Sequence, residues 1–366
     1  MNNKICVYAI AKNEEQNVER WVASMRPADH IIVLDTGSTD NTVELLLSLG
    51  VEVYQVTYED FRFDIARNDS LNLVPDEYNI RVCTDLDEYW EQSDWANIIK
   101  EYWNEDKPRM VYKYIWSHSD DGQNGLEFTI NKIHGNCGLQ WQGAVHEYLC
   151  DVKTGSKDFG NDYIDLTDKL TLHHYTNDID KTFYLDLAKK RVQEQPEDFQ
   201  SWFLLGNEQR VKGSILDAIE TYKYIIEHFP DEDSWELAGV YYYLGMCYQK
   251  IANGEKAMQA FSAGISINIF YRDNYYGLSI ILIDSGLYDM AIGVLKEALK
   301  TSQRVYGWME DPYTWTYAIY DMLALAYFYK EDYVMAVGYA AKALSFDTSN
   351  ETLKMKYDYY LEHISK

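Results

Sequence analysis

The chain has 366 residues, of which 33 are Lys or Arg and 59 are Asp or Glu, so its formal net charge is −26. This charge argues against a nucleic-acid or anionic-membrane partner, because phosphate groups need a basic surface, but it is compatible with a basic partner. The length favours two domains over a single core, and a hydrophobic content of 47% is typical of a globular protein.

The cysteines are few and far apart, and no two of them form a CxxC pair: Cys6, Cys83, Cys137, Cys150 and Cys247. They indicate neither a disulfide framework nor a zinc site, which fits a reducing compartment. The apolar run near the N-terminus is too short for a signal peptide, and no stretch reaches the roughly 18 apolar residues of a membrane span. We therefore expect a cytoplasmic protein without a membrane span.

Strand and helix patterns alternate through the first half of the chain. Buried strands are predicted at residues 4–11, 30–35, 51–58 and 79–87, with helical patterns at 13–25, 38–50 and 64–74. This repetition predicts an α/β domain with a mainly parallel, doubly wound, Rossmann-like sheet over residues 1–180. In such sheets ligands bind at the carboxyl ends of strands, so Asn13, Asp35 and Asp85 are expected on one rim.

From residue 181 the pattern changes to amphipathic helices with an internal repeat. Four successive segments have the residue offsets of tetratricopeptide repeats, in which small residues let two helices cross closely. The matching residues are Trp202, Leu205, Gly206, Ala218, Tyr222 and Pro230, then Tyr241, Leu244, Gly245, Tyr248, Ala257 and Phe261, then Leu278, Ala291 and Leu295, and finally Leu323, Ala336 and Ala343. Residues 181–366 are therefore predicted to be an all-α repeat domain with an insertion at 303–317.

The segment TDLDE at residues 84–88 places three carboxylates directly after a predicted strand. Carboxylates this close repel one another, so a cation or solvent must compensate. Asp85 and Asp87 could present one carboxylate to a ribose hydroxyl and the other to Mg²⁺ or Mn²⁺ bridging a diphosphate. A solvated turn is the alternative.

Three other segments of the same rim carry polar side chains. Asn13 and Glu14 follow the first strand, where they could reach a nucleobase or ribose or could cap a helix. Asp35 ends the second strand just before Gly37, which permits a tight turn. Arg67 precedes the acidic strand and could pair with a phosphate, orient a carboxylate, or lie on a solvated helix face.

The ordered segments AIAKNEE, IIVLDTGSTDNT, ARNDSL and TDLDE resemble glycosyltransferase family 2, whose members have the GT-A fold. LQWQGAVHEYL and LTLHHY extend the resemblance to about residue 180, toward a subgroup with a Trp-x-Gly-x-Val-His-Glu segment. With its helical repeats, the chain further resembles the peptide glycosyltransferases that modify glycocin bacteriocins. The resemblance therefore implies a GT-A domain followed by tetratricopeptide-like repeats.

The resemblance implies a role for each matching residue. The nucleotide sugar would contact Ala11, Asn13, Glu14, Asp35, Arg67, Asp85, Leu86 and Trp141. Asp85 and Asp87 would form the Asp-x-Asp motif, with Asp87 binding Mn²⁺ or Mg²⁺ and Asp85 close to the ribose and the metal. His174 would complete the metal coordination, although HHYTND lacks the glycine usual after this histidine. In a strand, His173 would point to the opposite face.

Glu147 falls where the family places its catalytic carboxylate. Transfer needs a base within hydrogen-bond reach of the acceptor hydroxyl or thiol, and a carboxylate near an aromatic such as Trp141 could have a suitably raised pKa. A structural ion pair is the alternative for Glu147. His146 is expected to be a pocket or packing residue.

The main interpretation is a metal-dependent, inverting glycosyltransferase. It would move a sugar from a UDP-sugar to a Ser, Thr or Cys side chain of a peptide or protein selected by the repeats. The alternatives are a saccharide or lipid-linked acceptor, a non-catalytic interaction protein, and a Mg²⁺-dependent phosphatase, although phosphatases of that kind usually carry their aspartates after the first strand. The aromatic faces of the repeats also suggest a homodimer.

Overall fold

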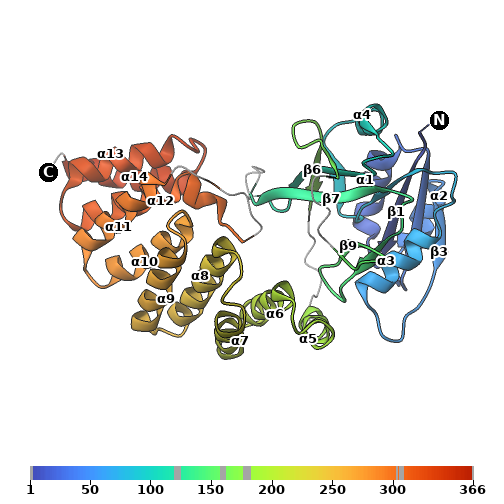
Figure 1. The fold of residues 1–366 in the computed structure, drawn as a ribbon. Helices are drawn as coiled ribbons and strands as arrows, with labels where there is room; N and C mark the ends of the chain where they lie inside the picture. Colours follow the sequence, from blue (N-terminus) through green and yellow to red (C-terminus); the bar gives the residue numbers. More distant parts are fainter. Residues whose placement is uncertain are drawn as a thin grey trace. The chain divides into compact units, whose positions relative to one another are not determined.

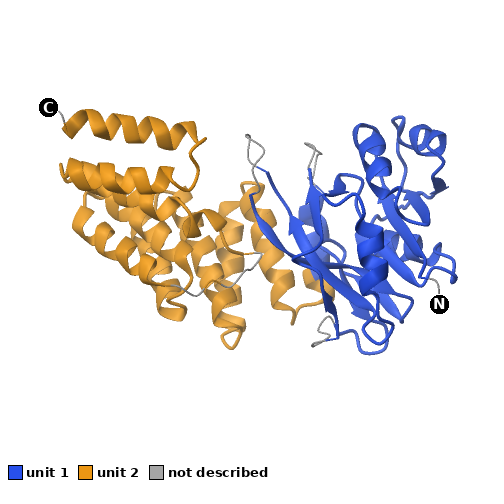
Figure 2. Ribbon diagram, turned by 90° about the horizontal axis from the view of Figure 1, so that it is seen from above, with its two compact units in different colours: residues 1–191 blue, residues 192–366 orange. Residues whose placement is uncertain are grey.

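The computed structural model describes residues 3–118, 125–156, 162–175, 183–301, 304 and 309–364. The chain divides into two compact units, residues 1–191 and residues 192–366 (Figure 2). The boundary predicted between residues 180 and 181 lies outside the described residues. An α/β unit followed by an all-α unit confirms the predicted fold class.

The first part of unit 1 has the predicted alternation of strands and helices (Figure 1): β1 (Ile5–Ala11), α1 (Glu15–Met25), β2 (His30–Asp35), α2 (Thr42–Ser48), β3 (Glu52–Gln55), α3 (Phe63–Asn72) and β4 (Ile80–Cys83). Strand β1 pairs in parallel with β2 on one side and with β4 on the other. Every residue of β1 is buried, as in parallel strands that are covered on both faces.

The second part of unit 1 makes the sheet mixed. It contains β5 (Glu88–Trp90), α4 (Trp95–Tyr102), β6 (Arg109–Ile115), β7 (Glu127–Gly135), β8 (Leu139–Gln142), β9 (Tyr148–Asp151), β10 (Ile164–Asp165), β11 (Thr171–His174) and α5 (Tyr184–Glu194). Among the described residues the sheet order is β3-β2-β1-β4-β7-β6-β11-β5, with β10 beside β6. Strand β7 runs antiparallel to β4 and β6, and β5 runs antiparallel to β11. The predicted parallel pattern therefore holds on the β3–β4 side, and β7 brings a strand of opposite direction beside the acidic turn.

Side chains alternate between the two faces of the sheet along β1, and helices cover both faces. Ile5, Val7 and Ala9 belong to one core, which includes Trp21 of α1 and Trp95 of α4. The intervening side chains of Cys6 and Tyr8 pack into a second core together with residues of α3 and β8. This alternation is the expected period of two in a strand, and it buries both faces of the central strands.

Unit 2 is built from helical hairpins. The described residues form the pairs α6 (Phe199–Val211) with α7 (Ile215–His228), α8 (Ser234–Lys250) with α9 (Gly254–Ile267), α10 (Arg272–Asp284) with α11 (Tyr288–Lys300), and α12 (Ala318–Tyr329) with α13 (Tyr333–Leu344), followed by α14 (Glu351–Ile364). Each pair corresponds to one of the four predicted repeats, which confirms them. Between the two helices of each pair one residue has a positive φ: Gly213, Ala252, Gly286 and Glu331. This left-handed residue is a common way to end a helix.

The repeated glycines are the points where the two helices of a hairpin cross. A Cβ atom on Gly206 would lie 2.7 Å from the ring of Tyr222, and one on Gly245 would lie 2.5 Å from the ring of Phe261. These are predicted repeat positions with the same spacing along the chain. A side chain at either glycine would displace the aromatic ring that fills the hairpin.

Gly277→Ala in α10 is expected to destabilise unit 2, because its Cβ would lie 2.4 Å from the ring of Phe261. Overpacking of this kind costs about 1–3 kcal/mol. Gly293→Ala in α11 is the matched control, because nothing lies within 4 Å of its Cβ position. An exposed helical Gly→Ala change stabilises by about 0.5–1 kcal/mol. Thermal unfolding checks both variants, and an equal shift of the two melting temperatures would contradict the packing argument.

The predicted insertion lies between the third and fourth hairpins, and part of it is outside the described residues. The described part includes a short 3₁₀ helix, Pro312–Trp315, and it packs on α8 and α10. The carboxylate of Asp273, which is 0% exposed, accepts hydrogen bonds from the backbone N–H of Asp311 at 2.8 Å and from the Thr314 hydroxyl at 2.7 Å. The insertion therefore covers part of the surface of the first helices of two repeats.

Candidate active site

The loops after β1 and β2 are tied together by Asp35 and Asn13. Asp35 is fully buried, and its Oδ2 accepts hydrogen bonds from the backbone N–H groups of Gly37 at 3.1 Å and Ser38 at 3.0 Å. Asn13 has a φ of 57°, and its Oδ1 accepts from the backbone N–H of Thr39 at 2.7 Å. The Asp35 contacts are those of the turn alternative, whereas Asn13 bonds to the loop after β2 and its side chain does not cap α1. A nucleoside contact of either residue stays a prediction.

Ala11 and Glu14 flank Asn13 with different surroundings. Ala11 is 3% exposed, and its backbone carbonyl accepts from the Thr36 N–H at 2.8 Å. Burial raises the pKa of Glu14 to about 7 against the effect of its hydrogen bond from Asn17, and the charges of Asp87 and Asp85 add to the rise. The carboxylates of the acidic turn after β4 therefore lie near enough to Glu14 to raise its pKa.

The acidic turn closes on itself between Asp85 and Glu88. The backbone N–H of Asp85 donates to Glu88 Oε2 at 2.9 Å, and the backbone N–H of Glu88 donates to the carbonyl of Asp85 at 3.1 Å. Leu86, predicted to contact the nucleotide sugar, is 2% exposed and packs in the core beneath the turn. The apolar side chain of the turn is therefore anchored in the core, while the Glu88 carboxylate, also fully buried, closes the turn.

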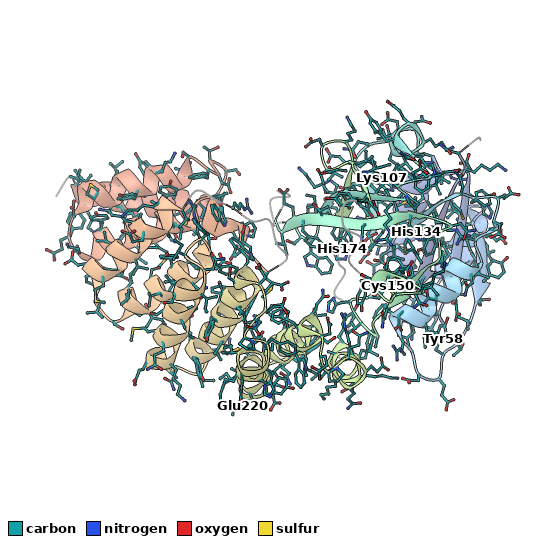
Figure 3. The ribbon with its side chains drawn as sticks, in the orientation of Figure 1. Tyr58, Lys107, His134, Cys150, His174 and Glu220 are labelled. Atoms are coloured by element: carbon teal, nitrogen blue, oxygen red, sulfur yellow. The ribbon has the colours of Figure 1, made fainter. Side chains whose placement is uncertain are left out.

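Asp87, in the turn between β4 and β5, and His174, at the end of β11, are far apart in the sequence but lie together in the fold. His174 ends β11 (Figure 3) and pairs with Glu88 in the antiparallel register of β5. Its Nε2 lies 3.2 Å from Asp87 Oδ2, and its Nδ1 lies 2.9 Å from the carbonyl oxygen of Trp116. Since Nδ1–H donates to that carbonyl, Nε2 is the ring nitrogen that faces Asp87.

Burial lowers the pKa of His174, but the hydrogen bond and charge of Asp87 outweigh it, so the pKa is raised. The second carboxylate oxygen of Asp87, Oδ1, is buried with no hydrogen-bond partner among the described residues. His173 points to the opposite face, where it stacks on Tyr89 with ring centroids 5.1 Å apart, as the strand alternation predicts.

Asp87 and His174 offer a carboxylate oxygen and an imidazole nitrogen to one position, and both atoms suit Mn²⁺. Within the described ranges, no group of three or more His, Cys, Asp or Glu side chains is arranged to hold a metal ion. A cation at this position would therefore have two protein ligands, with water and phosphate oxygens as the rest, which is common for Mg²⁺. The unpartnered Oδ1 fits such an ion.

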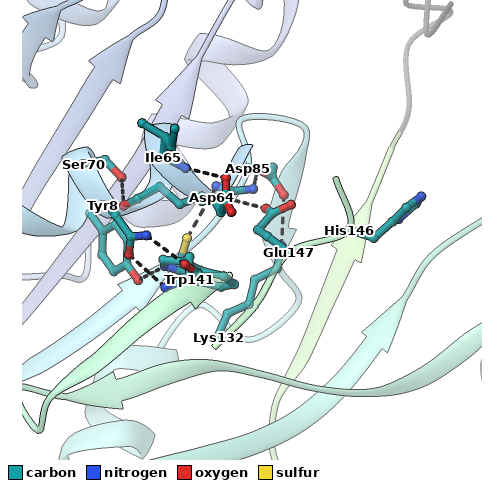
Figure 4. A network of polar contacts seen from close by, with 12 residues as sticks. Tyr8, Asp64, Ile65, Ser70, Asp85, Lys132, Trp141, His146 and Glu147 are labelled. Carbon is teal, nitrogen blue, oxygen red and sulfur yellow. Dashed lines mark hydrogen bonds and ion pairs between the residues drawn. The ribbon is translucent and has the colours of Figure 1, made fainter. Parts of the chain in front are cut away.

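Arg67 of α3 joins a buried charge network with Asp85 and Glu147, and Figure 4 shows these two carboxylates together with Lys132. Its Nη2 forms an ion pair with Asp85 Oδ1, and its Nε donates to Glu147 Oε1 at 2.8 Å. Its guanidinium carbon lies 5.7 Å from the ring centroid of Trp141. Burial alone would lower the pKa of Arg67, but the nearby acids raise it well above its usual value. The carboxylate-orienting prediction for Arg67 is the one that matches these contacts.

Lys132 of β7 joins the same network from the opposite side. Its Nζ lies 2.9 Å from Asp85 Oδ2 and 2.8 Å from Glu88 Oε1. Burial raises the pKa of Asp85, but the charges of Arg67 and Lys132 hold it far below the usual value. Both carboxylate oxygens of Asp85 are therefore engaged by cations, whereas Asp87 Oδ1 is not.

Glu147 is presented by a loop between β8 and β9 that Arg191 supports. Arg191 of α5 is fully buried, and its Nη1 donates to the carbonyl oxygens of Val145 at 2.9 Å and His146 at 2.8 Å. His146 has a φ of 50°, and its ring points away from Glu147 (Figure 4). The Glu147 side chain is 11% exposed, so its carboxylate lies at the edge of the buried network.

Trp141, the remaining predicted residue, is 4% exposed and lies beneath Arg67. Its indole N–H donates to the Tyr8 hydroxyl at 3.0 Å, so it is part of the core of this face. Three important residues were missing from the sequence-based site: Lys132, Glu88 and Arg191. Only Glu88 had a signal, as the third acid of TDLDE.

The first unit, which contains this charge network and the Asp87–His174 pair, is similar in sequence to known proteins. Residues 6–136 match the model of the family described as glycosyl transferase family 2. An uncharacterized glycosyltransferase of Rickettsia bellii (strain RML369-C) is 36% identical over 97 residues, which are 24% of this chain and 33% of that protein. The chain therefore matches about a third of the length of this curated relative.

Solved structures of other proteins match parts of the chain. A thermophilic TPR protein of Thermus thermophilus is 21% identical, with coverage of 48% of this chain and 88% of that one and a TM-score of 0.38. The MamA protein is 26% identical, with coverage of 46% and 83% and a TM-score of 0.36. Both TM-scores are below 0.5.

No helix among the described residues is long and apolar enough to cross a membrane.

The segment matched by the family model contains β1 to β7, and with them Arg67, Asp85, Asp87 and Lys132. Residues 6–136 are similar in sequence to the glycosyl transferases of family 2.

Proposed function

We propose that this protein transfers a sugar from a UDP-sugar to an acceptor, with Mn²⁺ or Mg²⁺ held at Asp87 and His174. The observation that carries the proposal is Asp87 Oδ1, a buried carboxylate oxygen without a partner among the described residues, next to the imidazole of His174 on the rim of a sheet similar to family 2 glycosyltransferases. A bound divalent cation would stabilise the negative charge that develops on the leaving diphosphate.

The other residues of the rim would position the donor and the acceptor. Asp85, held by Arg67 and Lys132, is proposed to face the ribose. Asn13, Glu14 and Asp35 would border the nucleoside.

Glu147 is proposed to take the proton from the acceptor hydroxyl or thiol in a transfer with inversion. Its Oε1 is oriented by Arg67, and Oε2 has no partner among the described residues. The alternative is that Glu147 serves only as a structural ion pair.

The test is a panel of nucleotide sugars with Mn²⁺ or Mg²⁺, followed by nucleotide release and by thermal shift. We expect at least one UDP-sugar to raise the melting temperature and to be hydrolysed slowly, both only with a divalent cation. If no nucleotide sugar produces either effect with either cation, the proposal is wrong.

His174→Ala is expected to raise the Mn²⁺ concentration needed for half-maximal donor hydrolysis. Loss of one metal ligand or its neighbour typically costs about 10- to 100-fold in metal affinity. His173→Ala is the matched control, because this ring lies on the opposite face of β11, against Tyr89. A metal titration checks both, and an unaltered curve for His174→Ala would exclude it as a ligand.

We further propose that unit 2 selects a peptide or protein acceptor with a reactive Ser, Thr or Cys. The support is the series of four hairpins, in which the first helices α8, α10 and α12 contact one another in turn, and the negative charge of the chain, which suits a basic acceptor. A saccharide or lipid-linked acceptor and a non-catalytic interaction protein are the alternatives.

Charge reversals distinguish these acceptors. Glu208→Lys on α6 and Glu236→Lys on α8 change half-buried positions of first helices, and Glu227→Lys changes an exposed position on the second helix α7. The assay uses a library of basic Ser-, Thr- or Cys-containing peptides and labelled donor. We expect Glu208→Lys and Glu236→Lys to weaken transfer without changing donor hydrolysis. Glu227→Lys should leave both transfer and donor hydrolysis at the wild-type level. Unchanged transfer in all three variants would contradict selection by the repeats.

The homodimer also stays a prediction, and sedimentation of the full-length chain tests it.

A further inference from the structure

The acidic turn after β4 is held at both of its ends by one side chain from another strand. Lys132 Nζ lies 2.9 Å from Asp85 Oδ2, where the turn begins, and 2.8 Å from Glu88 Oε1, where β5 begins. The lysine side chain is 12% exposed and that of Glu88 is 0% exposed. A single ammonium group therefore bridges two carboxylates that are themselves joined through the turn.

Glu88 extends this clamp to the backbone and to β6. Its Oε2 accepts from the backbone N–H of Asp85 at 2.9 Å, and its Oε1 accepts from the Tyr114 hydroxyl at 2.6 Å as well as from Lys132. Asp87 lies inside the closed turn, and its backbone carbonyl accepts from the N–H of Tyr175 at 2.9 Å. The side chain that faces His174 is thus carried by a segment whose two ends both contact Lys132.

The position of Lys132 follows from the direction of β7. In the antiparallel pairing of β7 with β4, Ile133 is opposite Val82, so Lys132 lies beside the end of β4, from which the turn starts. A parallel strand at this place in the sheet would bring its other end to the turn. Lys132 also offsets the repulsion between the carboxylates of Asp85 and Glu88, and of the two cations in this network it is the one that contacts both.

We propose that Lys132 is a positioning residue that holds the Asp85–Glu88 turn in the conformation that presents Asp87 to His174 and to a bound cation. The expected effect of Lys132 on metal and donor binding rests on the proposed function, but its effect on the conformation of the turn does not. The conformation of the turn itself can be measured without donor or metal.

The experiment compares the full-length chain with Lys132→Met, which keeps the length of the side chain and removes its charge. Lys113→Met on the neighbouring strand β6 is the matched control, because Lys113 has no ion pair with any described residue. Hydrogen–deuterium exchange of the 84–90 amides, without ligands, reports the turn. We expect faster exchange there in Lys132→Met, and exchange at the wild-type rate in Lys113→Met.

A Mn²⁺ titration of the thermal shift and of UDP-sugar hydrolysis reports the consequence. We expect Lys132→Met to need on the order of 10- to 100-fold more Mn²⁺, as for outer partners of metal ligands, with a smaller change in the maximal rate at saturating metal. A purely structural lysine would lower the melting temperature without moving the metal midpoint. That result would overturn the positioning role.

The double variant Lys132→Met/Glu88→Gln keeps the test valid if Lys132→Met fails to fold, because it removes both members of the buried pair. We expect it to fold and still to exchange faster at residues 84–90 than the wild-type chain. Wild-type exchange in every soluble Lys132 variant overturns the proposal. If exchange rises as expected but the wild-type chain uses no nucleotide sugar, only the proposed function fails.

Discussion

Asp87→Ala is expected to abolish metal-dependent use of the UDP-sugar while the fold survives. Asp87 is the carboxylate nearest to His174, and its Oδ1 is the buried oxygen without a partner among the described residues. Removing it deletes the proposed metal ligand, and loss of electrostatic stabilisation of this kind costs on the order of 10²- to 10³-fold in rate or more. Donor hydrolysis at saturating Mn²⁺ measures the effect.

The melting temperature separates this loss from unfolding. Removal of the unpaired Oδ1 favours stability, whereas loss of the contact between Oδ2 and His174 Nε2 opposes it, so we expect only a small change in the melting temperature. Asp168→Ala is the control, because Asp168 is an exposed aspartate in the loop before β11. Full activity of Asp87→Ala would remove the site assignment, and a large drop in its melting temperature would indicate a structural carboxylate.

Glu147→Gln is expected to lower transfer by roughly 10²- to 10⁴-fold, because the amide cannot accept a proton. The variant keeps an oxygen that can accept the hydrogen bond from Arg67 Nε, which spans 2.8 Å in the wild-type chain. Donor binding, measured by thermal shift with Mn²⁺, should therefore be retained. Single-turnover transfer to an acceptor peptide measures the chemical step.

The alternative for Glu147 gives a different pattern. If Glu147 is only a structural partner, Glu147→Gln leaves the buried Arg67 with one fewer negative charge beside it. Breaking a buried ion pair costs about 3–5 kcal/mol of stability. A fall in the melting temperature together with weaker donor binding, and no separate loss of transfer, would support the ion pair. Glu127→Gln on β7 is a control for the same chemical change at a half-buried position.

Much of the architecture could be predicted because it depends on local patterns. The apolar runs that became β1, β2 and β4, and the repeated glycines at 206 and 245, each act on neighbours close in sequence. The alternation of His173 and His174 followed from the period of a strand and is confirmed by their opposite contacts. The acidic turn was predictable as a rim feature, because strand ends in an α/β sheet are where polar residues gather.

By itself, then, the sequence determined the two-part architecture, the helical repeats and the residues that end the strands. Only the tertiary structure decided which charges meet. Lys132 reaches Asp85 because β7 runs antiparallel to β4, and Arg67 pairs with Glu147 across 80 residues of chain. Such pairs leave no periodic signal, since the energy of two charges depends on their distance and burial and not on their separation along the chain.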